Sequence, residues 1–449
     1  MQLAQLVDKP DMDNVFKLDM GAMPMIQEMM SNGIQVDLDA VSKLDHTLQD
    51  LLSSAEADIE QAIGQKLYFH GKWKGGRFSP KSGDQVAELL FEDLGLPSTG
   101  IKWTKKRTRL QVDNKTLSKL ADLPNPHPVI DGLKRHSKYS KYRDAFVLPM
   151  PKFVKSNGRI YCTIKPTRTA TGRLSMANPN LQQVPNRDEL GKSIRDCYVP
   201  KEGCVLLAID YSQVELRVMA HISGDTGMQQ AYFSNEDLHW MTAERIFQKP
   251  RTELASSDRK ASKTISFAIP YGAGPQGLRE QLLEIGLDGD YFTEEKCQEL
   301  IDSFLREAYP KVGEMMDLFH SRLTELGYVW DMWGRVRHCP GIYSVHEEIR
   351  AAAKREAGNS PIQSGAQGLP KTAMNVLLEV FHEYDRISYC KPLLQIHDEL
   401  LIEVAEEIAH DVAFVAQYIM EDCVKLDIPV EAEASLGYQW GTGMKEVVH

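Results

Sequence analysis

The segment from residue 205 to residue 217 is Val205-Leu206-Leu207-Ala208-Ile209-Asp210-Tyr211-Ser212-Gln213-Val214-Glu215-Leu216-Arg217, in which an apolar run ends at a carboxylate. Five apolar residues in a row are typical of a strand covered on both faces. Ser212 and Glu215 have the spacing of a helix capping box, so a helix is expected directly after the strand. The pattern places Asp210 in the strand-to-helix turn, where a plain turn-forming aspartate is the commoner alternative to a catalytic one.

A second pair of carboxylates interrupts an apolar run near the C-terminal end, in Leu393-Leu394-Gln395-Ile396-His397-Asp398-Glu399-Leu400-Leu401-Ile402-Glu403-Val404. This pattern predicts two apolar strands joined by a tight turn with Asp398 and Glu399 at its tip. Burying part of an acidic tip is costly unless cations neutralise it. Asp210 and Asp398 together could therefore hold a pair of divalent ions.

Cations and aromatic residues recur at every fourth position between these two segments, as Arg259, Lys263, Phe267 and Tyr271. On a helix each such step drifts by only about 40°, so all four share one side. A polyphosphate could lie along the two cations with a flat group stacked at the aromatic end, and an ordinary amphipathic helix is the alternative. Pro270 is expected to kink or end this helix, because it removes one helical hydrogen bond.

Length and composition place the chain among globular proteins of several domains. Its 449 residues predict about three domains, with 42% hydrophobic and 26% charged residues. No apolar run reaches the ~18 residues of a membrane span, and the acidic first 20 residues resemble no secretory or transit signal, so the expected compartment is the cytoplasm. The seven cysteines form no C-x-x-C pair, which argues against a zinc site and against a disulfide framework. They are expected to be packing residues.

The net charge of −11 hides a basic segment. Residues 66–143 contain 17 Lys/Arg against 7 Asp/Glu, a local balance of +10. Aromatic residues interleaved with this charge suggest a surface that follows a phosphate backbone, and a solvated basic face with ordinary core aromatics is the alternative. These aromatic residues are Tyr68, Phe69, Trp73, Phe78, Trp103, Tyr139 and Tyr142.

Periodicity predicts helices over 18–32, 37–63, 82–94, 115–123 and 129–146, and a hairpin or mobile loop over 68–78. A second domain is expected to begin near Gly158, where residues 159–164 alternate like a half-buried strand. The loops over 169–175 and 178–185 offer many neutral donors and one cation, Arg173. Such a set of side chains could contact the minor groove of a duplex, but the same residue types are equally common in turns.

The segment around Asp210, the segment 259–272 and the turn at 397–399 resemble, in this order, motifs A, B and C of family A DNA polymerases, the bacterial polymerase I and phage type. Further similar stretches are Thr169-Ala170-Thr171-Gly172-Arg173-Leu174-Ser175, Asn178 to Pro185, Gly334-Arg335-Val336-Arg337, and Arg355, Asn359, Pro361-Ile362-Gln363 and Ala366. The resemblance covers nearly the whole chain. It implies an α+β right-hand architecture with an antiparallel-sheet palm, helical fingers and a helical thumb. The implied domains are 1–157 (thumb and N-terminal scaffold), 158–220 (palm, first part), 221–345 (fingers) and 346–449 (palm, second part).

The resemblance also implies a mechanism, in which primer-template DNA is extended with deoxynucleoside triphosphates. Asp210, Asp398 and the backbone carbonyl of Tyr211 would bind two Mg²⁺ ions, for which Mn²⁺ can substitute. Lys263 would also give a proton to the leaving pyrophosphate. The residues implied to contact the nucleotide are Arg259, Lys263, His239, Phe267, Tyr271, Glu215 and Gln213. Those implied to contact DNA are Arg173, Arg355, Asn359, Gln363 and His397, and Glu399 supports the catalytic site.

Several positions depart from the family pattern. Ser266 and Ala268 stand where Asn and Gly are common, and Pro270 precedes Tyr271. Gly368-Leu369-Pro370 is expected to interrupt a helix that normally continues after Gln363. The chain begins where a thumb would, so we expect no proofreading exonuclease domain, either in a natural short polymerase with a separate exonuclease or replisome partner or in a trimmed fragment.

Two other functional classes remain as alternatives at this point. A single-subunit RNA polymerase shares the two palm carboxylates, but Glu215 and the thumb resemblance count against it. A catalytically silent DNA-binding relative is the other, and the presence of Asp210 and Asp398 beside Arg259 and Lys263 argues against it.

Overall fold

A five-stranded antiparallel sheet forms the centre of the computed structural model, which describes residues 9–234 and 236–447. Its strand order is β12-β11-β6-β10-β9. The bounds are β6 Cys204–Tyr211, β9 Cys390–Ile396, β10 Glu399–Ala405, β11 Ala432–Gly437 and β12 Lys445–Glu446. The run 205–209 on β6 is fully buried between β11 and β10, as its unbroken apolar sequence predicts. The predicted pair of strands around residues 397–398 is likewise confirmed as β9 and β10.

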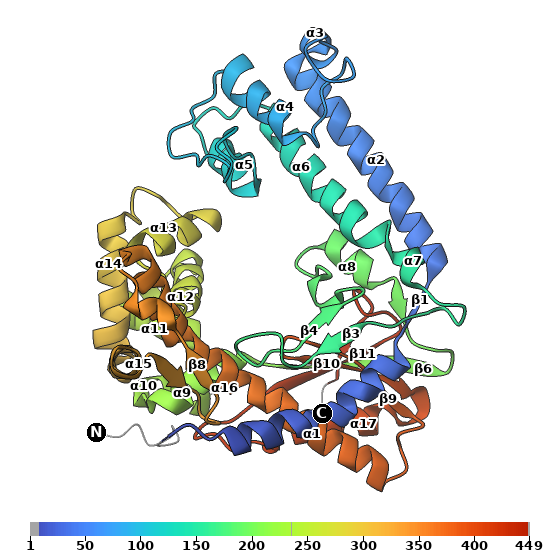
Figure 1. Cartoon of the computed structure of the whole chain (residues 1–449), viewed down its shortest axis with the longest axis vertical. Coiled ribbons are helices and arrows are strands. Elements are labelled where there is room, and N and C mark those ends of the chain that lie inside the picture. The colour runs from blue at the N-terminus through green and yellow to red at the C-terminus, as the bar shows by residue number, and fades with distance from the viewer. Residues whose placement is uncertain (1–8, 235, 448–449) are drawn as a thin grey trace.

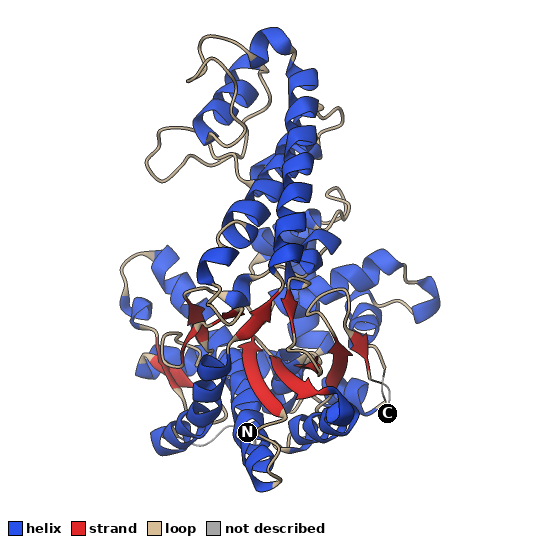
Figure 2. Ribbon diagram, turned by 90° about the vertical axis from the view of Figure 1, so that its right-hand side faces the viewer, coloured by secondary structure: helices blue, strands red, loops and turns tan. Residues whose placement is uncertain are grey.

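Three helices pack beneath this sheet, as Figures 1 and 2 show. They are α1 Met12–Asn32, α16 Glu347–Glu383 and α17 Ala409–Asp422. Their apolar faces and the strands share one large hydrophobic cluster, which includes Met25, Leu377 and Ile419. Burial of this continuous apolar surface supplies most of the driving force for this layered arrangement. The predicted α+β class with an antiparallel sheet is confirmed.

The helix α16 contradicts one prediction, because it runs through Gly368-Leu369-Pro370 without interruption. Gly368 leaves room for the ring of Trp333, since a Cβ there would lie 2.1 Å from ring atoms. Trp333 Nε1 donates a 2.8 Å hydrogen bond to the Gly365 carbonyl. Residues 364–371 are all buried. Tertiary packing on every side thus outweighs the local cost of proline and glycine.

A helical arm, defined here as residues 38–147, rises from one end of the sheet layer (Figure 1). Its long helices are α2 Leu38–Ile63 and α6 Val129–Tyr142, which η2 Arg143–Val147 extends. Asp37 caps α2 by accepting from the backbone amides of Asp39 and Ala40, each at 2.9 Å. The tip of the arm carries α3 Gln65–Tyr68, α4 Gly83–Glu88, η1 Leu89–Asp93 and α5 Asn114–Ala121.

The tip of the arm has a hydrophobic core of its own, separate from the large cluster. Tyr68, Trp73 and Phe78 are buried in it, so the core alternative was correct for these three aromatic residues. Phe69 and Trp103 are exposed. Residues 69–78 form turns and bends packed on this core and contain no strand, so the hairpin alternative was wrong and the segment is a loop.

A helical lobe, defined here as residues 226–326, stands opposite the arm (Figure 1). It contains α10 Thr226–Phe233, α11 Leu238–Phe247, α12 Ser256–Ala268, α13 Pro275–Glu284, α14 Glu294–Ser303 and α15 Pro310–Leu326. The helix α9 Val214–Ser223 leads from β6 into this lobe. A buried hydrogen bond of 2.7 Å between the hydroxyls of Thr242 and Tyr309 joins α11 to the start of α15. As Pro270 predicts, α12 ends just before it.

Short strands join the base of the arm to the sheet layer. The expected strand over 159–164 is divided between two sheets, since β2 Arg159–Ile160 pairs with β1 Ile34–Val36 and β3 Thr163–Lys165 pairs with β4 Ser175–Ala177. The remaining strands are β5 Tyr198–Val199, β7 Tyr328–Trp330 and β8 Val336–His338. The remaining helical segments are α7 Met150–Phe153, η3 Leu181–Gln183, α8 Glu189–Arg195, η4 Arg251–Glu253, η5 Phe304–Ala308, η6 Pro340–Tyr343 and η7 Glu406–Ile408.

All seven cysteines are free, and five of them are buried in the large hydrophobic cluster, which confirms the packing role of these five. Within residues 9–234 and 236–447, no helix has the length and apolar character needed to cross a membrane.

Candidate active site

Carboxylates from three neighbouring strands meet at one end of the central sheet. Asp210 near the end of β6 stands opposite Glu399 on β10 and opposite Glu433 on β11 in the strand register. Asp398 lies in the tight turn between β9 and β10, beside His397, which adopts a positive φ of 57°. The sheet therefore brings together Asp210 and the acidic turn, which lie nearly 190 residues apart in the sequence.

The surroundings of these carboxylates disfavour their charged forms. Burial raises the pKa of Asp210 to about 7, and the charges of Glu399, Asp398 and Glu433 add to the effect. Asp210 nevertheless reaches solvent. Burial also raises the pKa of Asp398 and of Glu399, against the opposing effects of Arg173 on the first and Arg195 on the second. Such a group of poorly neutralised carboxylates is suited to bind a divalent cation.

The donor set fits Mg²⁺, which favours carboxylate and carbonyl oxygens over nitrogen or sulfur. Across the part of the chain that the structure describes, no three His, Cys, Asp or Glu side chains gather closely enough to hold a metal ion by themselves. Asp210 and Asp398 would therefore leave coordination positions to the backbone, to water or to substrate oxygens.

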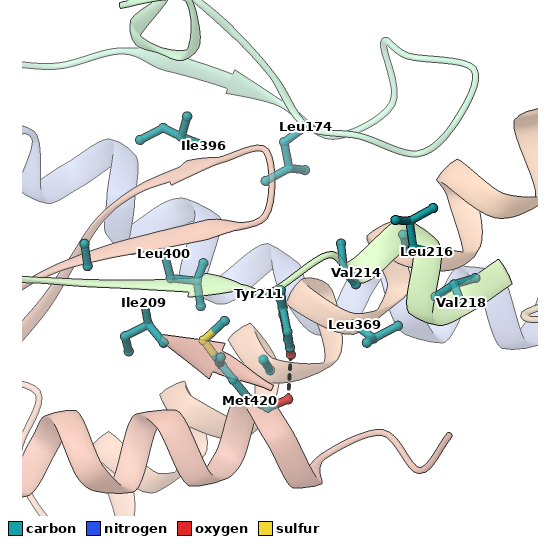
Figure 3. Packing of buried hydrophobic residues seen from close by; sticks show 14 of the residues in the cluster. Leu174, Ile209, Tyr211, Val214, Leu216, Val218, Leu369, Ile396, Leu400 and Met420 are labelled. Carbon is teal, nitrogen blue, oxygen red and sulfur yellow. Dashed lines mark hydrogen bonds between the residues drawn. The ribbon is translucent and has the colours of Figure 1, made fainter. Parts of the chain in front are cut away.

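The strand that carries Asp210 is held in place by buried contacts (Figure 3). Tyr211 is buried, and its hydroxyl donates a 2.8 Å hydrogen bond to the Met420 carbonyl on α17. Its ring lies among Ile209, Val214 and Leu400 (Figure 3). The backbone amide of Ser212 donates to the carbonyl of Glu431 at 2.9 Å. These contacts fix the position of the carboxylate against the sheet.

Glu215 contacts two residues from other segments and does not form the predicted capping box. The helix α9 begins at Val214, and its N-cap residue Gln213 is exposed, adopts a positive φ of 52° and makes no side-chain cap. Glu215 instead accepts a 2.5 Å hydrogen bond from Arg173 Nη2 and a short one from the Tyr271 hydroxyl. Two strong donors outside the helix thus compete successfully with the helix amides for this carboxylate.

Tyr271 links the lobe to this group. It follows the end of α12, so only Arg259, Lys263 and Phe267 of the predicted stripe lie on the helix. Burial and the Glu215 carboxylate raise the pKa of the Tyr271 hydroxyl to about 12, whereas a hydrogen bond with Gln363 lowers it. The structure therefore brings Tyr271, Glu215, Arg173 and Gln363 together.

The cations of α12 lie near the predicted histidine. Arg259 pairs with Asp237, with 2.5 Å between Nη2 and Oδ2. Lys263 is exposed and, among the described residues, has no carboxylate oxygen within 4.0 Å. His239 is buried with its ring centre 6.0 Å from that of Phe267, and its Nδ1 has no hydrogen-bond partner in the described structure. Burial lowers the pKa of His239 to about 4, and Lys263 and Arg259 contribute to the shift.

The predicted residues of α16 share one helix face. Arg355, Asn359 and Gln363 are spaced by four, and Arg355 and Asn359 are exposed and half-buried respectively. Arg355 packs against Gly272, whose φ is 72°, where a Cβ would lie 2.5 Å from the Arg355 side chain. The next position on the same face is Gln367, whose Nε2 donates a 3.1 Å hydrogen bond to Asp398 Oδ1.

Gln367, Glu433 and Arg195 are site residues that the sequence reasoning missed. Gln367 could have been found by continuing the spacing of four from Gln363. Arg195 is buried, lies 3.9 Å from Glu399 and stacks 4.1 Å from the ring centre of Trp440, whose Nε1 donates to Glu399 at 2.9 Å. Arg195 and Glu433 carry no local signal, since only strand pairing and packing bring them to the site.

Comparisons with known proteins agree on one family. A family model described as DNA polymerase family A matches residues 39–442. "DNA polymerase I, thermostable" from Thermus aquaticus is 31% identical over 419 residues, which cover 93% of this chain and 47% of that protein. DNA polymerase I from Deinococcus radiodurans is 32% identical over 93% of this chain and 41% of its own length.

A solved structure has the same fold. It is the POL domain of Pol1 from M. smegmatis in complex with DNA primer-template and dNTP, with a TM-score of 0.83 and 30% identity over 94% of this chain and 70% of that one. The chain spans less than half the length of the curated relatives named above.

Proposed function

The chain belongs to DNA polymerase family A, and on that premise we propose that it is a template-directed DNA polymerase. It would extend the 3′ end of a primer with deoxynucleoside triphosphates by two-metal-ion nucleotidyl transfer and release pyrophosphate. One observation carries the proposal, namely that Asp210 and Asp398 meet at the end of a buried sheet in surroundings that call for a cation. The resemblance seen in the three motifs is confirmed by the family match, and the relatives found are DNA polymerases, which gives no support to an RNA polymerase.

Asp210, Asp398 and the backbone carbonyl of Tyr211 would hold two Mg²⁺ ions, or Mn²⁺ in their place, which when bound lower the pKa of the primer hydroxyl and stabilise the reacting phosphate. Glu399 supports this arrangement. Its carboxylate accepts from Trp440 and lies beside Arg195, so it stays in place next to Asp210. Gln367 orients Asp398 by donating to one of its oxygens.

The residues of α12 would bind the triphosphate. Lys263 is exposed and has no carboxylate nearby in the described structure, so it can contact phosphate directly and give a proton to the departing pyrophosphate. Arg259 would exchange Asp237 for a phosphate oxygen, because both side chains of this ion pair are more than a third exposed. His239 would be neutral before binding and could use its unpartnered Nδ1. Phe267 and Tyr271 would frame the new base pair, with Gln213 and Glu215 nearby.

The duplex would lie between the arm and the lobe, which we propose are the thumb and fingers, with the sheet layer as palm. The proposed boundaries stay at 1–157, 158–220, 221–345 and 346–449. Neutral and cationic groups that suit the minor groove would read the shape of correct base pairs near the primer end. These groups are Arg173, Arg355, Asn359, Gln363 and His397. We further propose a cytoplasmic site of action in a bacterial or phage-infected cell.

A primer-extension assay with Mg²⁺ tests the function, comparing deoxyribonucleotides with ribonucleotides. The parental protein should extend with deoxyribonucleotides. The variant Asp398→Asn should lose extension while its affinity for primer-template stays within a few fold, because duplex binding rests on other contacts. Extension by this variant at more than about a hundredth of the parental rate would show that the two-metal assignment is wrong.

A further inference from the structure

The tip of the arm touches the lobe through charged side chains. Lys115 on α5 forms an ion pair with Glu280 on α13, through a short hydrogen bond from Nζ to Oε2. The same Nζ lies 3.8 Å from Oε1 of Glu284. Figure 1 shows that α5 is the part of the arm that approaches α13, and that this contact lies away from the sheet layer. The arm and the lobe, already joined at the sheet layer, thus have a second connection at their tips.

Opposite charges line the two sides of this contact. A cavity of about 320 Å³ lies between them, with Lys115, Lys119 and Lys134 on the arm and Glu280, Glu284 and Glu294 on the lobe. Each side also carries one charge of the other sign, Asp122 and Arg279. The hydrogen bond from Lys115 holds the pKa of Glu280 below its usual range, and the charges of Lys119 and Lys102 act in the same direction. The balance at this contact is therefore attractive.

The contact is also of a kind that opens easily. The side chains of Lys115, Glu280 and Glu284 are 43%, 28% and 51% exposed, so solvent and salt screen their attraction. Only one of the residues that line the cavity, Leu283, is a large apolar residue. Lysines on this arm are also the groups that a phosphate backbone would attract. The glutamates of the lobe therefore occupy positions where phosphates could compete.

We propose that Lys115, Glu280 and Glu284 form an electrostatic latch that holds the arm against the lobe when no nucleic acid is bound. Duplex DNA opens the latch because its phosphates compete with the two glutamates for the lysines of the arm. This proposal depends on the proposed polymerase function in one respect only, which is that the competing polyanion is duplex DNA.

Zero-length carbodiimide cross-linking with peptide mass spectrometry tests the contact directly, because this reagent joins only amines and carboxylates that touch. The DNA-free protein should yield a Lys115–Glu280 cross-link, and a saturating primer-template duplex should reduce it at least about fivefold. The pair Lys296 and Glu299 within α14, with 2.9 Å between its charged atoms, is the internal control and should be unaffected. The latch is wrong if the cross-link is absent without DNA or persists at saturating duplex.

Matched charge variants test the competition. Glu280→Gln should bind primer-template about three- to tenfold more tightly at low salt, with the gain shrinking at high salt. Glu299→Gln removes the same charge from the same lobe outside the contact, and it should change affinity far less. Equal affinities of the two variants would overturn the latch. A protein that shows the cross-link and the competition without extending primers would contradict the polymerase assignment and leave the latch intact.

Discussion

At the scale of single residues, Glu215 shows how a local pattern can suggest the wrong partner. The spacing of Ser212 and Glu215 predicts a cap on α9, yet Glu215 bonds Arg173 from 42 residues upstream and Tyr271 from 56 residues downstream. Burial raises the pKa of this carboxyl, and its two partners oppose the effect. These two hydrogen bonds hold the Glu215 side chain between Arg173 and the residue that follows the end of α12. We propose that it contacts the sugar of the incoming nucleotide from this position.

Replacing Glu215 should change the choice of sugar. Glu215→Ala removes a side chain that would exclude a 2′-hydroxyl, so the efficiency ratio of ribonucleotide to deoxyribonucleotide should rise about tenfold or more, which is about 1.4 kcal/mol of lost discrimination. Single-turnover incorporation of both nucleotides measures this ratio.

The matched control for this change is Tyr271→Phe, which removes one hydrogen-bond donor to Glu215 but keeps the carboxylate and the ring. It should alter the ratio much less than Glu215→Ala does. If Glu215→Ala leaves the ratio unchanged, the side chain does not lie over the sugar. Glu215→Ala should remove no helix cap, since the N-terminus of α9 has no side-chain cap.

At the scale of elements, α16 is the clearest case of packing that overrides local preference. It carries Arg355, Asn359, Gln363 and Gln367 along one face and passes two internal prolines, Pro361 and Pro370. A break at Gly368 would have displaced the C-terminal half of this helix, which packs on α1 and α17 beneath the sheet. The unbroken helix thus connects the site to the core.

Gly368→Ala should destabilise α16. The added Cβ would overlap the ring of Trp333, which must move and lose its hydrogen bond to the Gly365 carbonyl. We expect a loss of about 1–3 kcal/mol in the free energy of unfolding. Denaturant titration followed by circular dichroism measures the loss.

Gly277→Ala on α13 is the matched control, because a Cβ there meets only Ala273 at 4.0 Å. This change should stabilise the protein by up to about 1 kcal/mol, since alanine favours a helix over glycine. A stability of Gly368→Ala equal to that of Gly277→Ala would mean that Trp333 does not occupy the space above Gly368.

At the scale of the whole molecule, the tip of the arm and the sheet layer are packed around separate cores, whereas the base of the arm shares the core of the sheet layer. The tip of the arm has its own core around Trp73 and Phe78, whose ring centres are 5.4 Å apart, whereas the lobe and sheet share the large cluster. Two cores joined by long helices allow the tip of the arm to move without disturbing the carboxylates. This division is what a latch between arm and lobe requires.

Phe78→Ala should therefore have a local effect. Removing this buried ring costs about 3–5 kcal/mol where the core depends on it. Amide hydrogen exchange should accelerate within residues 65–133 and stay unchanged in β6 and β10. The matched variant Phe319→Ala removes a ring from the large cluster and should accelerate exchange in the lobe and sheet layer. Faster exchange in β6 of Phe78→Ala would show that the two cores unfold together.

Much of this protein follows from the sequence by itself. The apolar run 205–209, the acidic turn at 397–399 and the capped helix from Asp37 to Ile63 were predicted correctly, because strand burial, turn chemistry and helix periodicity are signals within a few neighbouring residues. The acidic strand end and the acidic turn suggested the pairing of Asp210 with Asp398, the family motifs supported it, and the family match confirms the resemblance.

Only the tertiary structure decided which partners the remaining groups have. Glu215 forms hydrogen bonds with Arg173 and Tyr271. The helix α16 continues past Pro370. Glu433 lies opposite Asp210 in the sheet, and Gln367 donates a hydrogen bond to Asp398. The aromatic residues of the basic segment divided between a core and a surface. Each of these outcomes depends on contacts between segments far apart in the sequence, whose packing and hydrogen bonds together outweigh the preferences of any single segment.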